Sequence, residues 1–342
     1  MVETENLYDY SRKVSTIGGG GGQNTALRGF RELNDPKLIT AIFGTWDNGG
    51  MSGLVRLKDG VMPPGDYFMC LYGLMHPDQS KSAQALLNDR ARTPMLRDVL
   101  AVAAERKYHG IQEGIDALRD LFRIEARLFP VSTMDLHLNA ETRNGHILEG
   151  ETSIDLRGES EDFDPEDITS NIFFDNDAHA NPLAVEAIDD SELIVSVPGS
   201  PYTSIFPHLL VNGIPQSIMN SEGKLVIAMN LMTTRGEDHH LKFASDWLKV
   251  YQHLLGDKRK INSTGQSRID YIVANCEEVD TEIVEAYRNK GQELVQIDED
   301  EIRRLAPGVR VIRKPLLDAE ELEKKFIRHD PVALAKAILE LK

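Results

Sequence analysis

A run of five glycines, Gly18 to Gly22, lies between a short apolar segment (residues 13–17) and a segment of helical composition (residues 23–30). This order predicts a β-strand, a tight turn and an α-helix. Glycine has no Cβ atom, so the turn can adopt positive φ angles and its amides can approach a ligand closely. Those N–H groups lie beside the positive end of the helix dipole, which favours a phosphate. The sequence therefore predicts an anion site near the start of the chain.

The glycine run departs from the known nucleotide-binding fingerprints. It fits G-x-G-x-x-G in no frame, because Gln23, Asn24 and Thr25 occupy the positions that a third glycine would need, and it lacks G-K-[ST]. A nicotinamide-dependent dehydrogenase is therefore disfavoured. From the run alone, nucleotide binding and a plain flexible turn are equally well supported.

Composition narrows the class of protein. With 342 residues, 41% of them hydrophobic, the chain can bury a large α/β core. The net charge of −17 argues against binding long nucleic acid, although loop amides and a few arginines can still bind a small anion. Cys70 and Cys276 are too few for a disulfide framework or a thiolate metal site. The sequence has no membrane-length apolar run and no basic-then-apolar leader, so we expect a cytoplasmic protein.

Apolar segments alternate with helical patterns along most of the chain. Near-continuous apolar runs predict strands buried on both faces, and a period of three to four residues predicts helices. We expect strands at residues 38–43, 193–197, 225–229, 271–274 and 293–297, and helices at residues 67–75, 182–188, 246–254, 281–290 and 331–341. The glycine run and the loops at 44–53, 198–204 and 230–237 each follow a predicted strand.

Two regions interrupt this alternation within what we interpret as one domain, residues 1–342. Residues 80–130 are predicted to be a helical insertion, with Leu96, Val99 and Leu121 on apolar stripes. Residues 134–180 are predicted to hold a pair of antiparallel strands around Asn144 and Gly145, with residues 152–156 also extended, followed by an exposed acidic loop at 158–177. Residues 44–66 are predicted to be one long loop.

Strand–helix alternation of this kind predicts an α/β fold with a doubly wound, mostly parallel sheet. Ligands of such sheets bind beyond the carboxyl ends of the strands. We therefore expect the four loops that follow strands to converge on one crevice.

Taken together, these loops resemble a known family. Residues 17–20, 39–53 and 63–66 resemble the N-terminal signature of the gluconeogenesis-factor branch of the 2-phospho-L-lactate transferase (CofD-like) superfamily. Residues 198–214 resemble its central signature, and residues 230–237 and 328–331 resemble two further motifs, all in the family's order. The resemblance implies a Rossmann-like core, a helical layer inserted after the second strand, and a ligand that carries a nucleotide diphosphate.

The resemblance implies two alternative functions. One branch is a magnesium-dependent transferase that moves a phospholactyl group from a guanosine diphosphate-activated donor to a deazaflavin. The other is similar to a cytoplasmic protein that binds a nucleotide sugar such as UDP-N-acetylglucosamine and influences cell shape, wall synthesis and carbon metabolism. The glycines around Ser52 and the segment 63–66 favour the second branch. Asp47-Asn48 replaces the family's usual Asp-Asp pair, and residues 67–69 and 234–238 also differ, so the ligand and any catalysis stay open.

The expected site residues lie in these motifs. Asp47 and Asp66 are the candidate catalytic residues and Mg²⁺ ligands, because two carboxylates at loop ends can hold a hard cation or take a proton from a hydroxyl. Turn bonding and helix capping are their alternative roles. We expect Arg328 to contact phosphate and Asn230 to bind a base or ribose. The expected ligand contacts are Gly18, Gly19, Gly20, Gly21, Asn48, Gly49, Gly50, Ser52, Pro198, Gly199, Ser200, Tyr202, Thr203, Ser204, Asn230 and Arg328. A homo-oligomer is compatible with the sequence.

Overall fold

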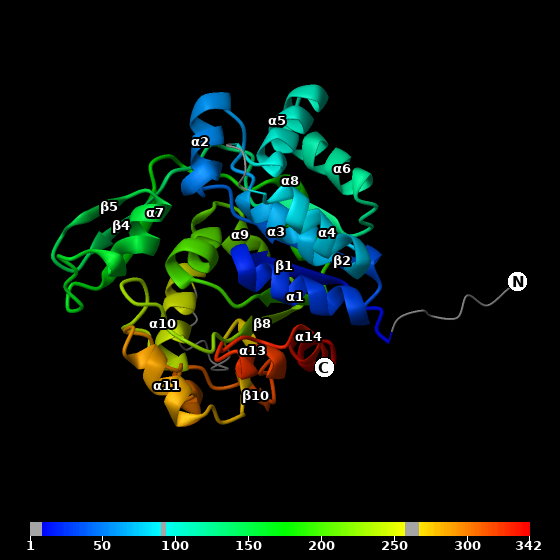
Figure 1. Cartoon of the computed structure of the whole chain (residues 1–342). Coiled ribbons are helices and arrows are strands. Elements are labelled where there is room, and N and C mark those ends of the chain that lie inside the picture. The colour runs from blue at the N-terminus through cyan, green and yellow to red at the C-terminus, as the bar shows by residue number, and fades with distance from the viewer. Residues whose placement is uncertain (1–8, 90–93, 257–266) are drawn as a thin grey trace, which may run out of the picture.

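The computed structural model describes residues 9–89, 94–256 and 267–342, and its centre is a seven-stranded sheet (Figure 1). Every neighbouring pair of strands in this sheet is parallel. The strand order is β10 (Arg310–Lys314), β9 (Ile269–Asn275), β8 (Lys224–Ala228), β7 (Leu193–Ser196), β1 (Val14–Gly18), β2 (Ile39–Phe43) and β3 (Arg127–Pro130). The prediction of a doubly wound parallel α/β sheet is confirmed.

Helices cover both faces of the sheet. On one face, α1 (Gly20–Leu33) packs between α3 (Gly65–Leu74) and α14 (Pro331–Leu339). The chain runs from β1 to β3 toward one edge of the sheet, and from β7 to β10 toward the other edge. Because parallel crossovers are right-handed, the connections that lead to β7, β8, β9 and β10 place four helices on the other face: α8 (Pro182–Asp189), α9 (Ile214–Asn220), α10 (Ala244–Leu254) and α12 (Glu299–Leu305). Because both faces are covered, β1, β2 and β7 are buried along their whole length. This explains the near-continuous apolar runs of these strands.

A helical segment lies between β2 and β3 and begins before the helical insertion predicted at residues 80–130. It comprises α2 (Gly50–Asp59), α3, α4 (Pro77–Leu87), α5 (Leu96–Tyr108) and α6 (Ile111–Leu121), with α5 and α6 at one edge of the molecule (Figure 1). The predicted apolar stripes are partly wrong. Leu96, Val99 and Leu121 are 49%, 48% and 62% exposed. The buried residues of α5 are instead Asp98, Ala101 and Ala104. Asp98 can be buried because its carboxylate accepts a hydrogen bond from the backbone N–H of Met95 at the start of the helix.

The smaller sheet has three antiparallel strands rather than the predicted two. Its order is β5 (Ile147–Glu149), β4 (Leu138–Thr142) and β6 (Thr169–Phe174), and it projects from one side of the main body (Figure 1). β6 lies inside the region predicted to be an acidic loop, where its pairing with β4 outweighs the polar composition. Residues predicted to be extended at 152–156 largely form α7 (Glu151–Asp155).

Two further predictions about elements are wrong. The loop predicted at residues 44–66 contains α2, whose two glycines, Gly50 and Gly53, lower its helix propensity and make it hard to recognise. Residues 293–297 form no strand of the sheet, because their backbone bonds are divided between Leu231 and Thr233 on one side and Lys242 on the other. The last strand is β10, which carries charged, partly exposed residues at the sheet edge.

The remaining helices are α11 (Thr281–Arg288) and α13 (Ala319–Glu323), and short helical turns cover Pro36–Leu38, Leu156–Glu159, Pro201–Ile205 and Phe206–Leu210. Asp330 caps α14, since its carboxylate accepts a hydrogen bond from the N–H of Ala333 at 2.7 Å. Within the described residues, no helix has the length and apolar character needed to cross a bilayer.

Candidate functional site

The glycine run forms the last residue of β1 and the first turn of α1. Gly19 is the N-cap of the helix and has no side chain to satisfy the first N–H groups. Gly20 has φ +58°, a left-handed conformation that favours glycine. A Cβ atom at Gly22 would lie 1.6 Å from the carbonyl oxygen of Pro198, so only glycine fits there. The run therefore brings the start of α1 against the turn that follows β7.

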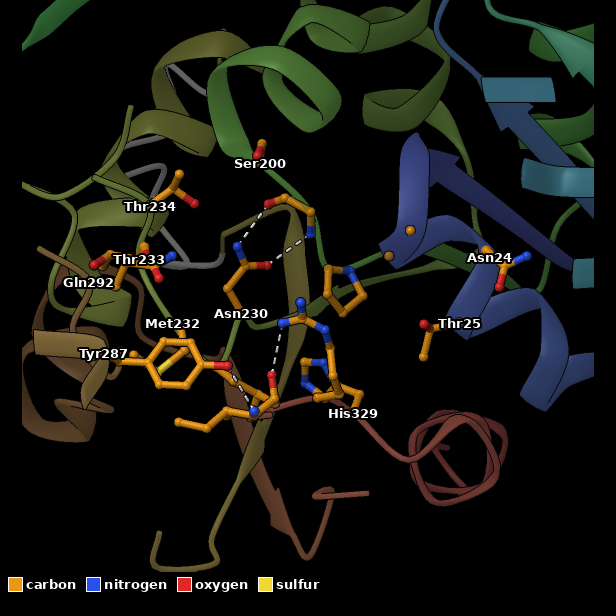
Figure 2. A pocket seen from close by; sticks show the side chains of 17 residues that line it. Asn24, Thr25, Ser200, Asn230, Met232, Thr233, Thr234, Tyr287, Gln292 and His329 are labelled. Atoms are coloured by element: carbon orange, nitrogen blue, oxygen red, sulfur yellow. Dashed lines mark hydrogen bonds between the residues drawn. The ribbon is translucent and has the colours of Figure 1, made fainter. Parts of the chain in front are cut away.

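A cavity of about 460 Å³ opens at this contact, beyond the carboxyl ends of β1, β7 and β8. Figure 2 shows Asn24 and Thr25 of α1 on one side, Tyr287, Met232, Thr233 and Gln292 on the other, and Asn230 and His329 between them. The cavity is lined by Gly21, Gly22, Asn24, Thr25, Pro198, Gly199, Ser200, Asn230, Leu231, Met232, Thr233, Thr234, Tyr287, Gln292, Ile327, Arg328 and His329. Four of the sequence motifs thus meet at the crevice that strand order predicts.

Asn230 holds the turn after β7 in place. Its Oδ1 accepts a hydrogen bond from the N–H of Gly199 at 2.9 Å, and its Nδ2 donates to the Gly199 carbonyl oxygen at 2.8 Å (Figure 2). We expected this side chain to bind a base or ribose. In the structure both of its polar atoms bind the backbone of one residue, Gly199, so its visible role is to orient Gly199 at the wall of the cavity.

The rest of the central motif is directed away from the cavity. Tyr202 and Thr203 donate their backbone N–H groups to Oε1 of Glu237, at 3.0 and 3.1 Å. Both are buried, and neither lines the cavity, nor does Ser204. Of the expected contacts in this motif, the structure places Pro198, Gly199 and Ser200 at the cavity. Sequence reasoning assigned no role to Glu237, although it lies in one of the motifs that carry the resemblance.

Asp66 lies directly behind the glycine turn. Its Oδ1 accepts a hydrogen bond from the N–H of Gly20 at 2.9 Å, and a Cβ atom at Gly19 would lie 2.5 Å from its Oδ2. Burial raises the pKa of Asp66 to about 7, and the Asp47 carboxylate adds to this effect. Asp66 therefore provides the cap that Gly19 lacks at the start of α1, whereas the N-cap of its own helix, α3, is Pro64.

Asp47 and Asp66 belong to a larger acidic group that also includes Glu151. Oδ1 of Asp47 accepts a hydrogen bond from the N–H of Gly49 at 2.8 Å, and burial raises the pKa of Asp47. Burial, followed by the charges of Asp47, Asp155 and Asp66, raises the pKa of Glu151 to about 8. Glu151 was missed by sequence reasoning, because it becomes part of this acidic group only when α7 packs beside the loop after β2.

The remaining expected contacts after β2 do not line the cavity. Asn48 faces the small sheet, where its Oδ1 accepts hydrogen bonds from the N–H and hydroxyl of Thr152, each at 2.9 Å. Gly49, Gly50 and Ser52 lie at the start of α2. Gly18 and Gly19 likewise pack against protein atoms rather than the cavity, Gly18 against Val197.

Arg328 and His329 bring the fourth motif to the cavity. Nη1 of Arg328 donates to the carbonyl oxygen of Ile327 at 3.1 Å, and the residue lines the cavity. Burial lowers the pKa of His329 to about 4, so its imidazole is neutral at pH 7. Among the described residues that line the cavity, Arg328 is the only one with a formal charge at that pH.

The acidic residues do not form a complete metal site by themselves. Within the ranges that the structure describes, no group of three or more His, Cys, Asp or Glu side chains is arranged to hold a metal ion. Asp47 and Asp66 supply oxygen donors suited to Mg²⁺, which is commonly held by one or two carboxylates together with substrate phosphates. These residues fit Mg²⁺ only if a bound diphosphate contributes further ligands.

Known proteins share this sequence and fold. The family described as 2-phospho-L-lactate transferase CofD matches residues 14–317. Relatives named as gluconeogenesis factors include a protein of Thermotoga maritima, 30% identical over 333 residues (95% of this chain and 98% of the relative), and one of Bacillus subtilis, 27% identical over 335 residues (96% and 98%). A crystal structure of a UPF0052 family member from Bacillus halodurans has a TM-score of 0.82 at 27% identity and covers 96% of this chain and all of its own. The chain therefore belongs to the CofD family, in its gluconeogenesis-factor branch.

Proposed function

We propose that this protein binds a nucleotide sugar of the UDP-N-acetylglucosamine type and acts in the cytoplasm as a regulator of cell shape, wall synthesis and carbon metabolism. The observation that carries the binding proposal is the cavity where the first turn of α1, Ser200 and Arg328 meet. The names of the relatives support the regulatory role in carbon metabolism.

The chemistry of the cavity suits a diphosphate. The first turn of a helix leaves N–H groups without intrahelical partners, and Gly21 and Gly22 line the cavity at that turn. Arg328 adds a guanidinium that can donate two hydrogen bonds to phosphate oxygens. The site therefore attracts an anion locally, although the net charge of the chain is −17.

The remaining walls suit a base and a sugar. Tyr287, Met232 and Ile327 provide apolar surface, and Thr234 and Gln292 bring polar groups beside it. The volume of about 460 Å³ lies in the range of about 300–1,000 Å³ that is common for small-molecule sites. Polar and apolar surface at one cavity is the pattern expected for a nucleotide rather than for inorganic phosphate alone.

Isothermal titration calorimetry with UDP-N-acetylglucosamine tests the proposal, and position 21 provides matched variants. A Cβ atom at Gly21 meets nothing within 4 Å, so Gly21→Ala and Gly21→Asp both fit the backbone. An aspartate in the first turn also suits the helix dipole, so Gly21→Asp should fold well while placing a carboxylate where we place the diphosphate. We expect Gly21→Asp to lose at least about tenfold in affinity and Gly21→Ala to lose little. No heat with the unaltered protein at millimolar ligand would refute the proposal.

A magnesium-dependent transferase of the phospholactate type is the second candidate, and the juxtaposition of Asp66 with Gly20 favours it. When bound, Mg²⁺ would neutralise charge on the diphosphate. Asp47 and Asp66 would hold it, and whichever of them is ionised could take a proton from an acceptor hydroxyl. Incubation with a guanosine diphosphate-activated donor and a deazaflavin, followed by mass spectrometry, decides between the two candidates. Absence of a deazaflavin that carries the phospholactyl group, with folded protein, would exclude this reaction.

A further inference from the structure

A fully buried carboxylate, that of Glu237, lies behind the turn that follows β7. It comes from the connection between β8 and α10, more than 30 residues away along the chain from the turn that it contacts. The proposed diphosphate contacts do not use it, since Glu237 does not line the cavity. A buried acidic side chain that is not part of the ligand site requires a structural explanation.

Oε1 of Glu237 binds the turn at several points. It accepts hydrogen bonds from the N–H of Tyr202 at 3.0 Å, from the N–H of Thr203 at 3.1 Å and from the Thr203 hydroxyl at 3.2 Å. Burial raises the pKa of Glu237 to about 7, and a hydrogen bond with the Ser200 side chain partly opposes this effect. The backbone amides of Tyr202 and Thr203, two of the expected ligand contacts, are thus already satisfied by a carboxylate of the same chain.

The other side of the turn is held by Asn230, which binds both the N–H and the carbonyl oxygen of Gly199. Asn230 and Glu237 belong to the same connection, residues 229–243, between β8 and α10. Two side chains of one connection therefore hold both ends of the short segment 199–203, whose first two residues line the cavity.

We propose that Glu237 is a positioning residue that fixes segment 199–203, so that Gly199 and Ser200 present a rigid wall to the bound diphosphate. The proposal rests on the proposed nucleotide binding for its functional consequence. Its structural part does not depend on any ligand. Preorganised donors bind more tightly than mobile ones because less conformational entropy is lost on binding.

Hydrogen exchange of the ligand-free protein tests the structural part. Glu237→Ala removes the acceptor of three hydrogen bonds and leaves buried donors unpaired, whereas Glu237→Gln keeps an acceptor oxygen in nearly the same place. We expect amide exchange in the peptide that spans residues 198–205 to accelerate about tenfold or more in Glu237→Ala and less than about threefold in Glu237→Gln. Ile188→Ala, at a fully buried residue of α8, controls for a general loss of stability and should not accelerate this peptide selectively.

Affinity for UDP-N-acetylglucosamine, measured by calorimetry on the same four proteins, tests the functional part. We expect Glu237→Ala to bind about tenfold more weakly, with recovery in Glu237→Gln and no change in Ile188→Ala. Adding Ser200→Ala to Glu237→Ala should cost less than the sum of the two single effects, because both act on one segment. Unchanged exchange in Glu237→Ala, or equal losses in the alanine and glutamine variants, would overturn the positioning role. If the unaltered protein shows no heat with this ligand while exchange follows the expected pattern, the proposed function fails and the fixation of the segment stands.

Discussion

Alanine at two neighbouring glycines of the first turn of α1 should change stability in opposite directions. At Gly22, a Cβ atom would lie 1.6 Å from the carbonyl oxygen of Pro198 and 2.6 Å from the carbonyl carbon. Since Cβ atoms essentially never approach heavy atoms within 3.0 Å, the helix and the turn after β7 would have to separate by more than about 1 Å. At Gly21, the same atom meets nothing within 4 Å.

The magnitudes follow from these two environments. Overpacking of this kind costs about 1–3 kcal/mol, and the better helix propensity of alanine returns up to about 1 kcal/mol. We therefore expect Gly22→Ala to lower the free energy of unfolding by about 1–2 kcal/mol. Gly21→Ala should raise it by up to about 1 kcal/mol, because it restricts the unfolded chain without a clash.

Urea denaturation followed by tryptophan fluorescence provides the assay. Trp46 and Trp247 are the two tryptophans of the chain and both are 2% exposed, so their emission reports loss of the packed core. The slope of the free energy against urea should be the same for both variants, and only the midpoint should move. Equal shifts of the two midpoints, or a stabilised Gly22→Ala, would show that α1 does not approach Pro198 as closely as the structure indicates.

Three further substitutions test other parts of the site. Glu151→Gln should make the protein more stable than its parent by about 1–2 kcal/mol at pH 9 and should have no effect near pH 4, as measured by thermal melting across pH. The pKa of this carboxyl is raised to about 8 in the folded protein, so its ionisation destabilises the fold as the pH rises from the ordinary carboxyl pKa to about 8. Asn230→Ala should destabilise the fold by about 1–3 kcal/mol, as measured by urea denaturation, since it leaves the backbone N–H and the carbonyl oxygen of Gly199 without Asn230 as a partner. Asn230→Asp should lose only the hydrogen bond to the carbonyl oxygen. Arg328→Ala should reduce the affinity for UDP-N-acetylglucosamine about tenfold. The melting temperature should change by less than about 2 °C, because among the described residues the Arg328 side chain hydrogen-bonds only the adjacent Ile327 carbonyl oxygen. Unchanged affinity would remove Arg328 from the site.

The sequence predicts the centre of the fold better than its edges. β2 and β7 are buried on both faces, so their apolar runs are long and easily recognised. β10 lies at the sheet edge with charged residues at both ends, and its sequence does not differ from that of an exposed loop. α2 has two glycines, Gly50 and Gly53, and packs against α5, which is distant along the chain. Local propensity carries no information about such contacts.

The same distinction applies to the site. The convergence of the glycine run with segments 198–200 and 230–234 follows from strand order, which alternation of elements predicts. The use of each side chain does not follow from strand order. Asn230 and Glu237 both bind protein atoms, and which polar residue faces a ligand and which satisfies the backbone depends on pairings between distant segments. A motif of polar residues therefore locates a site without assigning its contacts.

The acidic group beside the glycine turn and the net charge of −17 both oppose the binding of the proposed diphosphate, and protonation of the buried carboxyls reduces this opposition. Burial raises the pKa of Asp66 to about 7 and that of Glu151 to about 8, so near neutral pH these carboxyls are protonated for a substantial part of the time. A nearby anion would raise both pKa values further, whereas a divalent cation would lower them. A proton and the proposed Mg²⁺ would therefore compensate the charge of Asp66 in alternative ways, and we expect the affinity for the proposed diphosphate to depend on which of them is bound. Because the helix amides are fixed dipoles that do not titrate, they provide the part of the attraction that persists at any pH.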